Sequence, residues 1–219
     1  QIYLDKNFNW THHLMPSFFP EESSQNVVIY ITGTGVSKDF TVMAVNTLPD
    51  FQLLANGQGL PLYLYEANNT PTQQTAQGGL FDEPPAPTAT GYTRRDAITD
   101  AGLNHFLTAY PNQTITKEDV FYYIYGLLHS EDYKTKYADN LTKELPRIPC
   151  VKQTSDFWAF SKAGRDLAEL HINYETVKPY PVTFDGGKLS IDMLSPEDFR
   201  VTQMKFAKKG DKSTVIYNS

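Results

Sequence analysis

The spacing of the apolar residues changes twice along this chain of 219 residues, and that order limits the folds that it can adopt. Residues 27–32, 40–46 and 60–65 are short runs of β-branched and aromatic residues, which are typical of strands. From residue 101 to about residue 171 the apolar residues recur every three or four positions, which indicates helices. Short strand-like runs return after residue 180. This order predicts an α+β fold with a mixed sheet, in which a central run of about four helices lies between strand-rich N- and C-terminal parts.

Glycine and proline residues refine the expected strands. Gly33 and Gly35 follow the first run, and the segment after them, SKDFTVMAV, has the composition of another strand. A nucleotide-binding loop needs a helix at that point, so the two glycines predict a plain hairpin turn. Pro61 cannot donate a backbone hydrogen bond, so it favours an edge or starting position. Two further hairpins are predicted from the turn signals DGG at 185–187 and KGD at 209–211.

The stretch from residue 66 to residue 91 differs in composition from the rest. It is rich in Pro, Gly, Thr and Gln and has almost nothing to bury, so residues 66–92 are predicted to be a flexible loop or linker. Residues 1–65 contain three predicted strands, which are too few to bury a core alone, and we expect them to complete the sheet. Residues 93–219 then supply the helical block and the C-terminal strands, and the whole chain forms one domain.

Four helices are expected in the middle of the chain. Thr99 or Asp100 caps a helix over 101–110, Thr116 caps the second, and Ser130 caps a third that continues to Pro146. The fourth runs from about residue 155 to residue 171, although Gly164 lowers the helix propensity at its middle.

Residues capable of catalysis or metal binding are few and scattered. A single cysteine, Cys150, excludes an internal disulfide and any multi-thiolate metal site. His12 and His13 are adjacent, and on an extended chain they point to opposite faces, which makes them a poor chelate. His105, His129 and His171 lie on separate predicted helices and are expected to pack. We therefore expect no catalytic residue, no metal ligand and no cofactor site in this chain.

The charge is distributed unevenly. Residues 1–92 carry 2 Lys or Arg and 8 Asp or Glu, a net charge of −6, whereas residues 93–219 carry 17 of each. Five basic residues and one acid fall within 200–212, so a surface for a polyanion is expected in the second half. There is no leader peptide and no apolar run near the roughly 18 residues that span a bilayer, so a cytoplasmic chain without a membrane partner is expected.

Three segments together carry a specific signature. They read ITDAGLNHF from Ile98, then ITKEDVFYYIYGLLHSEDYKTKYADNLTKELPRIP, then FWAFSKAGRDLAELHINYE. In order and spacing they resemble the C-terminal target-recognition region of type ISP restriction–modification enzymes, and LPDFQLLANGQGLPLYLY upstream is similar as well. The resemblance covers the chain from about residue 45 to its end, except for the stretch 66–91.

The resemblance implies a division of labour within a longer bacterial polypeptide. In that family a nuclease, a translocase and an adenine methyltransferase precede this region, which reads the DNA target for methylation and cleavage. This chain has no Walker lysine motif and no Asn-Pro-Pro-Tyr loop; the nearest string is DEPPAP at 82–87. It is therefore expected to be a non-catalytic recognition module of a larger protein. The resemblance implies that S-adenosylmethionine, ATP and Mg serve the parent protein, and that double-stranded DNA and the methyltransferase domain are the partners of this region.

Candidate DNA-binding residues are those able to contact phosphates or base edges from loops and turns. They are Arg94, Arg95, Lys152, Gln153, Ser155, Lys178, Tyr180, Lys205, Lys208 and Lys209, with Lys212 in the same basic hairpin. Four residues that match the family framework are expected to hold structure instead: His129, Arg147, His171 and Glu175.

Two other functions stay open at this point. The acidic first part favours a protein-interaction domain, and the tyrosines at 122, 123 and 125 suggest a small-molecule hydrolase pocket, although a helix buried between layers explains them as well. A hydrolase would gather buried titratable groups in one cleft.

Overall fold

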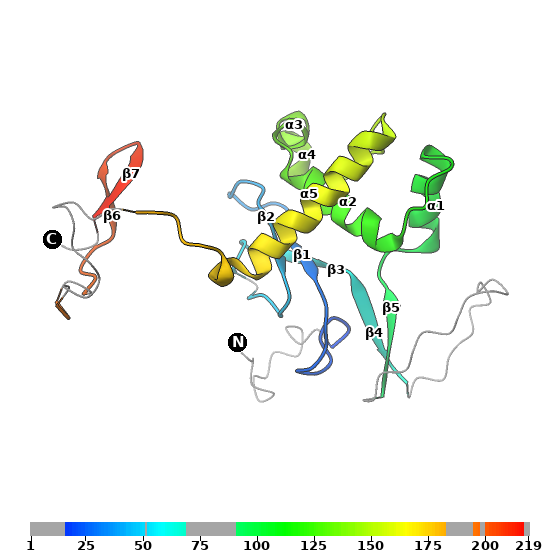
Figure 1. Cartoon of the computed structure of the whole chain (residues 1–219), viewed down its shortest axis with the longest axis horizontal. Helices are drawn as coiled ribbons and strands as arrows, with labels where there is room; N and C mark the ends of the chain where they lie inside the picture. Colours follow the sequence, from blue (N-terminus) through cyan, green and yellow to red (C-terminus); the bar gives the residue numbers. More distant parts are fainter. Residues whose placement is uncertain (1–15, 51, 69–90, 183–194, 198–199, 217–219) are drawn as a thin grey trace. The chain divides into compact units, whose positions relative to one another are not determined.

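The computed structural model describes residues 16–50, 52–68, 91–182, 195–197 and 200–216, and the account below covers those ranges (Figure 1). They divide into two compact units, Gln1–Val177 and Lys178–Ser219. Helices and small antiparallel sheets make up the chain, which confirms the α+β class. The described strands form three separate antiparallel sheets rather than one mixed sheet, because the C-terminal strands pair with each other and the strands around the predicted linker pair among themselves.

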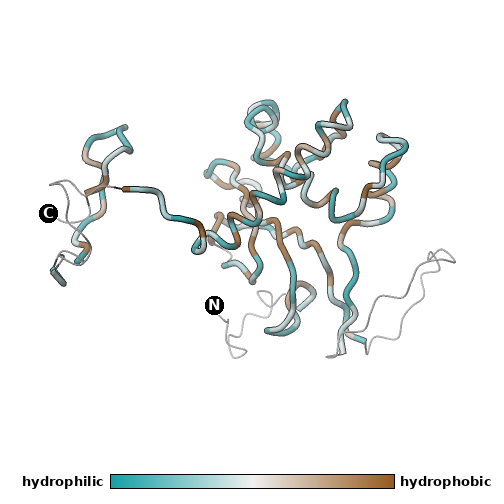
Figure 2. Tube along the Cα trace, viewed as in Figure 1, coloured by the Kyte–Doolittle hydropathy of each residue, from teal (hydrophilic) through white to brown (hydrophobic). Residues whose placement is uncertain are grey.

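The N-terminal sheet contains three strands in the order β2-β1-β3. They are β1 (Val28–Ile31), β2 (Val42–Val45) and β3 (Gln58–Pro61), and all pairings are antiparallel. Every residue of the central strand β1 is buried, as its apolar sequence VIYI requires. Pro61 lies in an edge strand, as predicted, where its missing N–H breaks no ladder. Figure 2 shows hydrophobic residues along these strands and along the helices above them.

The glycines at 33 and 35 form the predicted turn and no nucleotide loop. Gly35 has a φ of +73°, and the Thr32 N–H donates to the Thr41 carbonyl at 3.0 Å, so the chain returns into β2. Gly33 is needed for a different reason, since a Cβ there would lie 2.2 Å from the Asn56 carbonyl oxygen.

The predicted strand at 60–65 is divided between two sheets, which corrects that prediction. The break comes at Leu62, and the next strand, β4 (Tyr63–Ala67), pairs with β5 (Tyr92–Asp96) instead. Buried Asn26 causes the change: its side-chain amide accepts from the Tyr63 N–H at 3.0 Å and donates to the Tyr63 carbonyl at 2.8 Å. Glu66, Ala67 and Tyr92 of the predicted linker therefore belong to strands, while residues 69–90 lie outside the described part.

The helices begin at the predicted caps. They are α1 (Asp100–Ala109), α2 (Lys117–His129), α3 (Glu131–Lys136), α4 (Ala138–Leu141) and α5 (Thr154–Ile172), followed by a short 3₁₀ helix, η2 (Tyr174–Thr176). The hydroxyls of Thr99, Thr116 and Ser130 accept first-turn N–H groups, which confirms all three caps. The predicted third helix is broken at Tyr137 and ends at Leu141, well before Pro146.

Helices α2 and α5 cross one another (Figure 1), and two glycines lie where their backbones meet. A Cβ on Gly164 would lie 2.0 Å from the Tyr122 carbonyl oxygen, and a Cβ on Gly126 would lie 2.2 Å from the Phe160 carbonyl oxygen. The two backbones are therefore closer than any side chain permits. Gly164, which sequence reasoning treated as a weak point of the helix, is required by this contact.

Tyrosines from three helices hold the extended segment that precedes α5. The hydroxyls of Tyr133, Tyr123 and Tyr110 donate to the carbonyls of residues 147, 149 and 151, at 2.7, 2.6 and 2.8 Å. Burial raises the pKa of Tyr110 and of Tyr133 to about 12, which keeps both hydroxyls protonated. Tyr123 is 0% exposed, so the interpretation of a helix buried between layers is confirmed for it. We call these three bonds the tyrosine ladder.

Two histidines meet where the last turns of α2 and α5 come together. The rings of His129 and His171 are 5.6 Å apart, and His171 Nδ1 shares a hydrogen bond with the Tyr125 hydroxyl. His129 Nε2 is buried and has no hydrogen-bond partner among the described residues. Burial, followed by the neighbouring His171 and Lys134, lowers the pKa of His129 from 6.5 to about 4. Both residues therefore hold structure, as the resemblance implied.

The glycine contact predicts a large effect of one methyl group. Gly164→Ala should destabilise the chain by about 3 kcal/mol or more, because the new Cβ would meet the backbone of α2. The free energy of unfolding in urea measures the change. Gly102→Ala is the matched control: its Cβ would lie 3.4 Å from the Thr99 hydroxyl, and alanine should stabilise α1 by up to about 1 kcal/mol. If the two variants were equally stable, the close contact of Gly164 with the backbone of α2 would be contradicted.

The histidine pair predicts a pH dependence of stability. Because the pKa of His129 is lower in the folded chain, the unfolded chain binds the proton first as the pH falls. The contribution of neutral His129 to the free energy of unfolding is complete above pH 6.5 and is lost between pH 6.5 and about pH 4. The change is on the order of 2 kcal/mol for a partly exposed ring. His129→Phe should reduce this loss in urea unfolding at pH 7, 5.5 and 4. An unchanged pH profile in the variant would refute the assignment.

Candidate nucleic-acid interface

The first pair of candidate residues lies on the ribbon formed by β4 and β5. The Arg94 guanidinium lies 4.2 Å over the Tyr63 ring, and Arg95 forms an ion pair with Glu66. Both arginines are exposed. Among the described residues Arg94 has no acidic partner, so it is the stronger candidate for a phosphate, whereas part of the Arg95 charge is neutralised.

The second group lies at the start of α5. Lys152 and Ser155 are exposed, and Gln153 is the N-cap residue of the helix, with no side-chain capping bond. Their position is fixed by the last rung of the tyrosine ladder, at Val151, and by Trp158, whose Nε1 donates to Gln113 Oε1 at 2.9 Å. Side chains at this point therefore extend from a rigid support.

Helix α1 separates these two groups. Arg94 and Arg95 precede its first turn in β5, and the Tyr110 hydroxyl at its other end bonds to Val151, next to Lys152. The ten residues of α1 span about 15 Å. The structure thus brings Arg94 to one end of α1 and Lys152 to the other, and it does not bring them into contact.

The remaining candidates lie in the second unit. Strands β6 (Lys205–Lys208) and β7 (Asp211–Ile216) form the predicted hairpin, with Gly210 at a φ of +86° in its turn. Its lysines are all exposed: Lys205, Lys208, Lys209 and Lys212. Lys178 is also exposed, as is Tyr180, at 83%. The other predicted hairpin falls mostly on residues 183–194, outside the described part.

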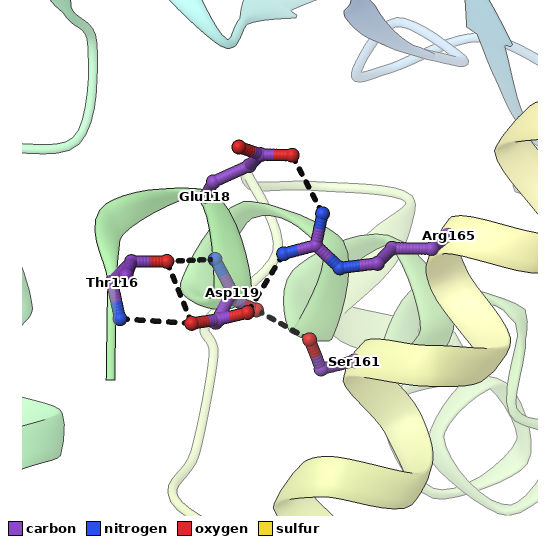
Figure 3. Close-up of polar contacts among 5 residues, drawn as sticks. All are labelled: Thr116, Glu118, Asp119, Ser161 and Arg165. Carbon is purple, nitrogen blue, oxygen red and sulfur yellow. Dashed lines mark hydrogen bonds and ion pairs between the residues drawn. The ribbon is translucent and has the colours of Figure 1, made fainter. Parts of the chain in front are cut away.

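A dense polar cluster links α2 to α5 and could be mistaken for an active site (Figure 3). Arg165 donates to Glu118 at 2.6 Å and to Asp119 at 2.7 Å, and Ser161 donates to the backbone carbonyl of Asp119 at 3.0 Å. Burial alone would raise the pKa of Asp119, but the bonds from Thr116 and Arg165 outweigh burial and lower it. Asp119 is thus the acid of a capping box and stays charged, while the Ser161 hydroxyl donates to a backbone carbonyl rather than to a general base.

Two surface hollows of the first unit offer no better site. One, of about 550 Å³, is lined by Tyr122, Arg165, Asp166, Glu169 and Leu170, and is wide open. A smaller one of about 140 Å³ lies beside Tyr133, Tyr137 and Leu145. Neither contains a serine, cysteine or histidine, and Tyr123 and Tyr125 are buried in the core rather than in a pocket. Neither of these two hollows therefore supports the hydrolase interpretation.

The same described residues lack a metal-binding cluster and a membrane-spanning helix. They contain no group of three or more His, Cys, Asp or Glu side chains placed to hold a metal ion. None of their helices has the length and apolar character needed to cross a membrane.

Two of the four framework residues, Arg147 and Glu175, have exposed side chains. The Arg147 side chain is 83% exposed and pairs with Glu144 at 2.9 Å, so its structural part is played by its carbonyl in the tyrosine ladder. Glu175 is exposed in η2. Arg165, which joins α5 to the first turn of α2, was not singled out from the sequence, because its acidic partners lie 46 and 47 residues away.

Solved structures of larger proteins contain similar chains. A structure described as the ATP-dependent Type ISP restriction-modification enzyme LlaBIII bound to DNA is 35% identical over 93% of this chain, with a TM-score of 0.64. A nuclease-deletion mutant of the Type ISP enzyme LlaGI in complex with a DNA substrate mimic is 31% identical over 93%, with a TM-score of 0.59. A DrdV–DNA complex is 38% identical over 76%, with a TM-score of 0.62.

This chain spans only 12 to 14% of the length of those three proteins. A search of curated proteins found no match. A family model described as the Type ISP C-terminal specificity domain matches all of residues 1–219. The resemblance carried by the FYYIYGLLHS and ELPRIP motifs is confirmed, and the chain belongs to the family of Type ISP C-terminal specificity domains.

Proposed function

We propose that this chain reads the DNA target sequence on behalf of a restriction–modification polypeptide and performs no chemistry itself. The observation that carries the proposal is its 35% identity, over 93% of its length, to part of a Type ISP enzyme bound to DNA. The exposed basic residues on the β4–β5 ribbon, at the start of α5 and on the β6–β7 hairpin support it. Duplex DNA in the cytoplasm is then the partner.

Recognition of DNA by residues of these kinds divides into two tasks. Phosphate contacts set affinity and register, while contacts to base edges set sequence. Arg94, Lys178 and the hairpin lysines 205, 208, 209 and 212 are suited to phosphates. Gln153, Ser155 and Tyr180 carry neutral donors and acceptors, and they are suited to base edges or to bridging waters. Lys152 lies beside Gln153 and serves as its phosphate anchor.

The chemistry belongs to the rest of the polypeptide in this proposal. The parent is an adenine methyltransferase and ATP-dependent nuclease, which uses S-adenosylmethionine, ATP and Mg in other domains. The described residues of this chain include no phosphate-binding glycine loop followed by a helix, so we assign none of these groups to it. The residues of this chain position the target sequence for those domains and bind other DNA sequences less tightly.

The acidic first part suits contact with a neighbouring domain. Residues 1–92 have a net charge of −6, which opposes a phosphate backbone but is tolerated at a protein interface. We therefore assign this part to the methyltransferase domain of the same polypeptide, so that the protein-interaction function, the second candidate, accompanies DNA reading.

Methylation mapping tests the proposed function directly. Genomic DNA from cells with and without the full-length gene is sequenced for modified adenines. One short motif methylated only with the gene is the expected result. Methylation without any sequence motif, together with equal binding to all duplexes, would refute target recognition.

The hairpin lysines predict a sequence-independent loss of affinity. The double change Lys208→Ala and Lys209→Ala in the full-length polypeptide should weaken binding to every duplex and lower the slope of log K against log salt by about 2, since each phosphate contact releases counterions. Titrations at several salt concentrations measure both quantities. Lys162→Ala is the control, because Lys162 already pairs with Asp166 at 2.6 Å. A changed target motif, or an unchanged slope, would contradict the assignment to phosphates.

A further inference from the structure

The outward face of α1 is unusual for a solvent-exposed helix. Leu103, Phe106, Leu107 and Tyr110 face the core, at the spacing of an amphipathic helix. The exposed positions follow the same spacing on the other side: Ala101, Asn104, His105, Thr108 and Ala109. We call these five residues the α1 stripe. It is one continuous strip of small and neutral polar side chains.

Charged residues are absent from the stripe itself, and the nearest ones in sequence, Asp100 in the first turn of α1 and Lys117, pair with each other at 2.6 Å. Residues 101–116 contain no Asp, Glu, Lys or Arg, although such residues make up 20% of the chain. Exposed helix faces of globular proteins normally carry charges, because charged side chains keep them solvated. Depletion of charge is instead typical of the centre of an interface, where each charge would have to be desolvated.

Two polar side chains of the stripe, Asn104 and Thr108, are not engaged in holding the fold, whereas the His105 ring contacts Phe106 edge-on. Among the described residues the Asn104 amide has no hydrogen-bond partner. The Thr108 hydroxyl donates to the Asn104 carbonyl at 2.8 Å, which leaves its oxygen free to accept. Asn104 and Thr108 thus keep donors and acceptors for another molecule.

Cations lie near the two ends of the neutral α1 stripe, whose neighbour in the first turn, Asp100, is already paired with Lys117. Arg94 in β5 lies before the first turn of α1, and Lys152 lies beside its last turn through the Tyr110 bond to Val151. Neither forms an ion pair among the described residues. A neutral strip of about 15 Å between two unpaired cations complements the major groove of DNA, which has uncharged base edges between two phosphate backbones.

We propose that the α1 stripe enters the major groove of the target duplex, where Asn104, His105 and Thr108 contact base edges while Arg94 and Lys152 contact the flanking phosphates. Asparagine pairs with adenine through two hydrogen bonds, and alanine or threonine methyl groups pack against the thymine methyl. A protein partner fits less well, because the stripe carries no large apolar or aromatic anchor. This inference rests on the proposed function and adds the element that reads the bases.

Selection from a randomised duplex library tests the inference. The full-length polypeptide and its variants N104A, H105A and T108A each select bound duplexes, which are then sequenced. Each variant should lose roughly 5- to 150-fold in preference at one or two base positions and keep it at the others. Thr135→Ala is the matched control, because Thr135 is an exposed threonine on α3. It should select the parent motif.

The possible results separate the two proposals. A parent motif that all three variants retain overturns the α1 stripe and leaves the proposed function in place. Equal loss of binding to all sequences in the variants also overturns it, and points to a face that docks another domain. A parent polypeptide that selects no motif overturns the proposed function itself. Unfolding midpoints show that the variants are folded, and alanine at an exposed helical position favours the helix.

Discussion

The backbone contact between α2 and α5 at Gly126 and Gly164 is the constraint on which the first unit depends. Two helices this close leave no room for a Cβ at the crossing, and they place the next polar groups within hydrogen-bonding distance. Arg165, one residue beyond the crossing, therefore meets the capping box of α2, and Ser161 meets the Asp119 carbonyl (Figure 3). The first turn of α2 is held in this way by α5 as well as by its own cap.

The same crossing determines where the candidate DNA contacts lie. Residues 146–151 cannot pair as an ordinary strand, because Pro146 and Pro149 lack N–H groups. The carbonyls of residues 147, 149 and 151 accept hydrogen bonds from the hydroxyls of Tyr133, Tyr123 and Tyr110 instead. The segment is therefore fixed without a sheet partner. The chain then enters α5 at Lys152 and Gln153. Loops on a rigid scaffold are the usual place for recognition residues, and the tyrosine ladder supplies that rigidity here.

Local signals in the sequence predicted local features well. The three hydroxyl caps, the Gly35 turn, the Gly210 hairpin and the edge position of Pro61 each depend on a few neighbouring residues, and all are confirmed. Features with distant partners were not predictable in this way. The division of the strand at Leu62 depends on Asn26, which is 37 residues from Tyr63, and the need for Gly164 appears only when α2 is placed against it.

The candidate site shows the same contrast between features with local signals and features with distant partners. The motifs predicted the family and the kind of partner, but composition could not show that Arg94 and Lys152 lie at opposite ends of one helix, because that arrangement depends on the Tyr110 bond to Val151. It has a consequence for how such a domain can change its target. The residues of the α1 stripe make few contacts that support the fold, so substitutions there cost little stability, whereas the glycine crossing and the tyrosine ladder tolerate almost none. The residues that we propose to contact bases are thus different from the residues that hold the fold. The target sequence can therefore change while the scaffold stays fixed.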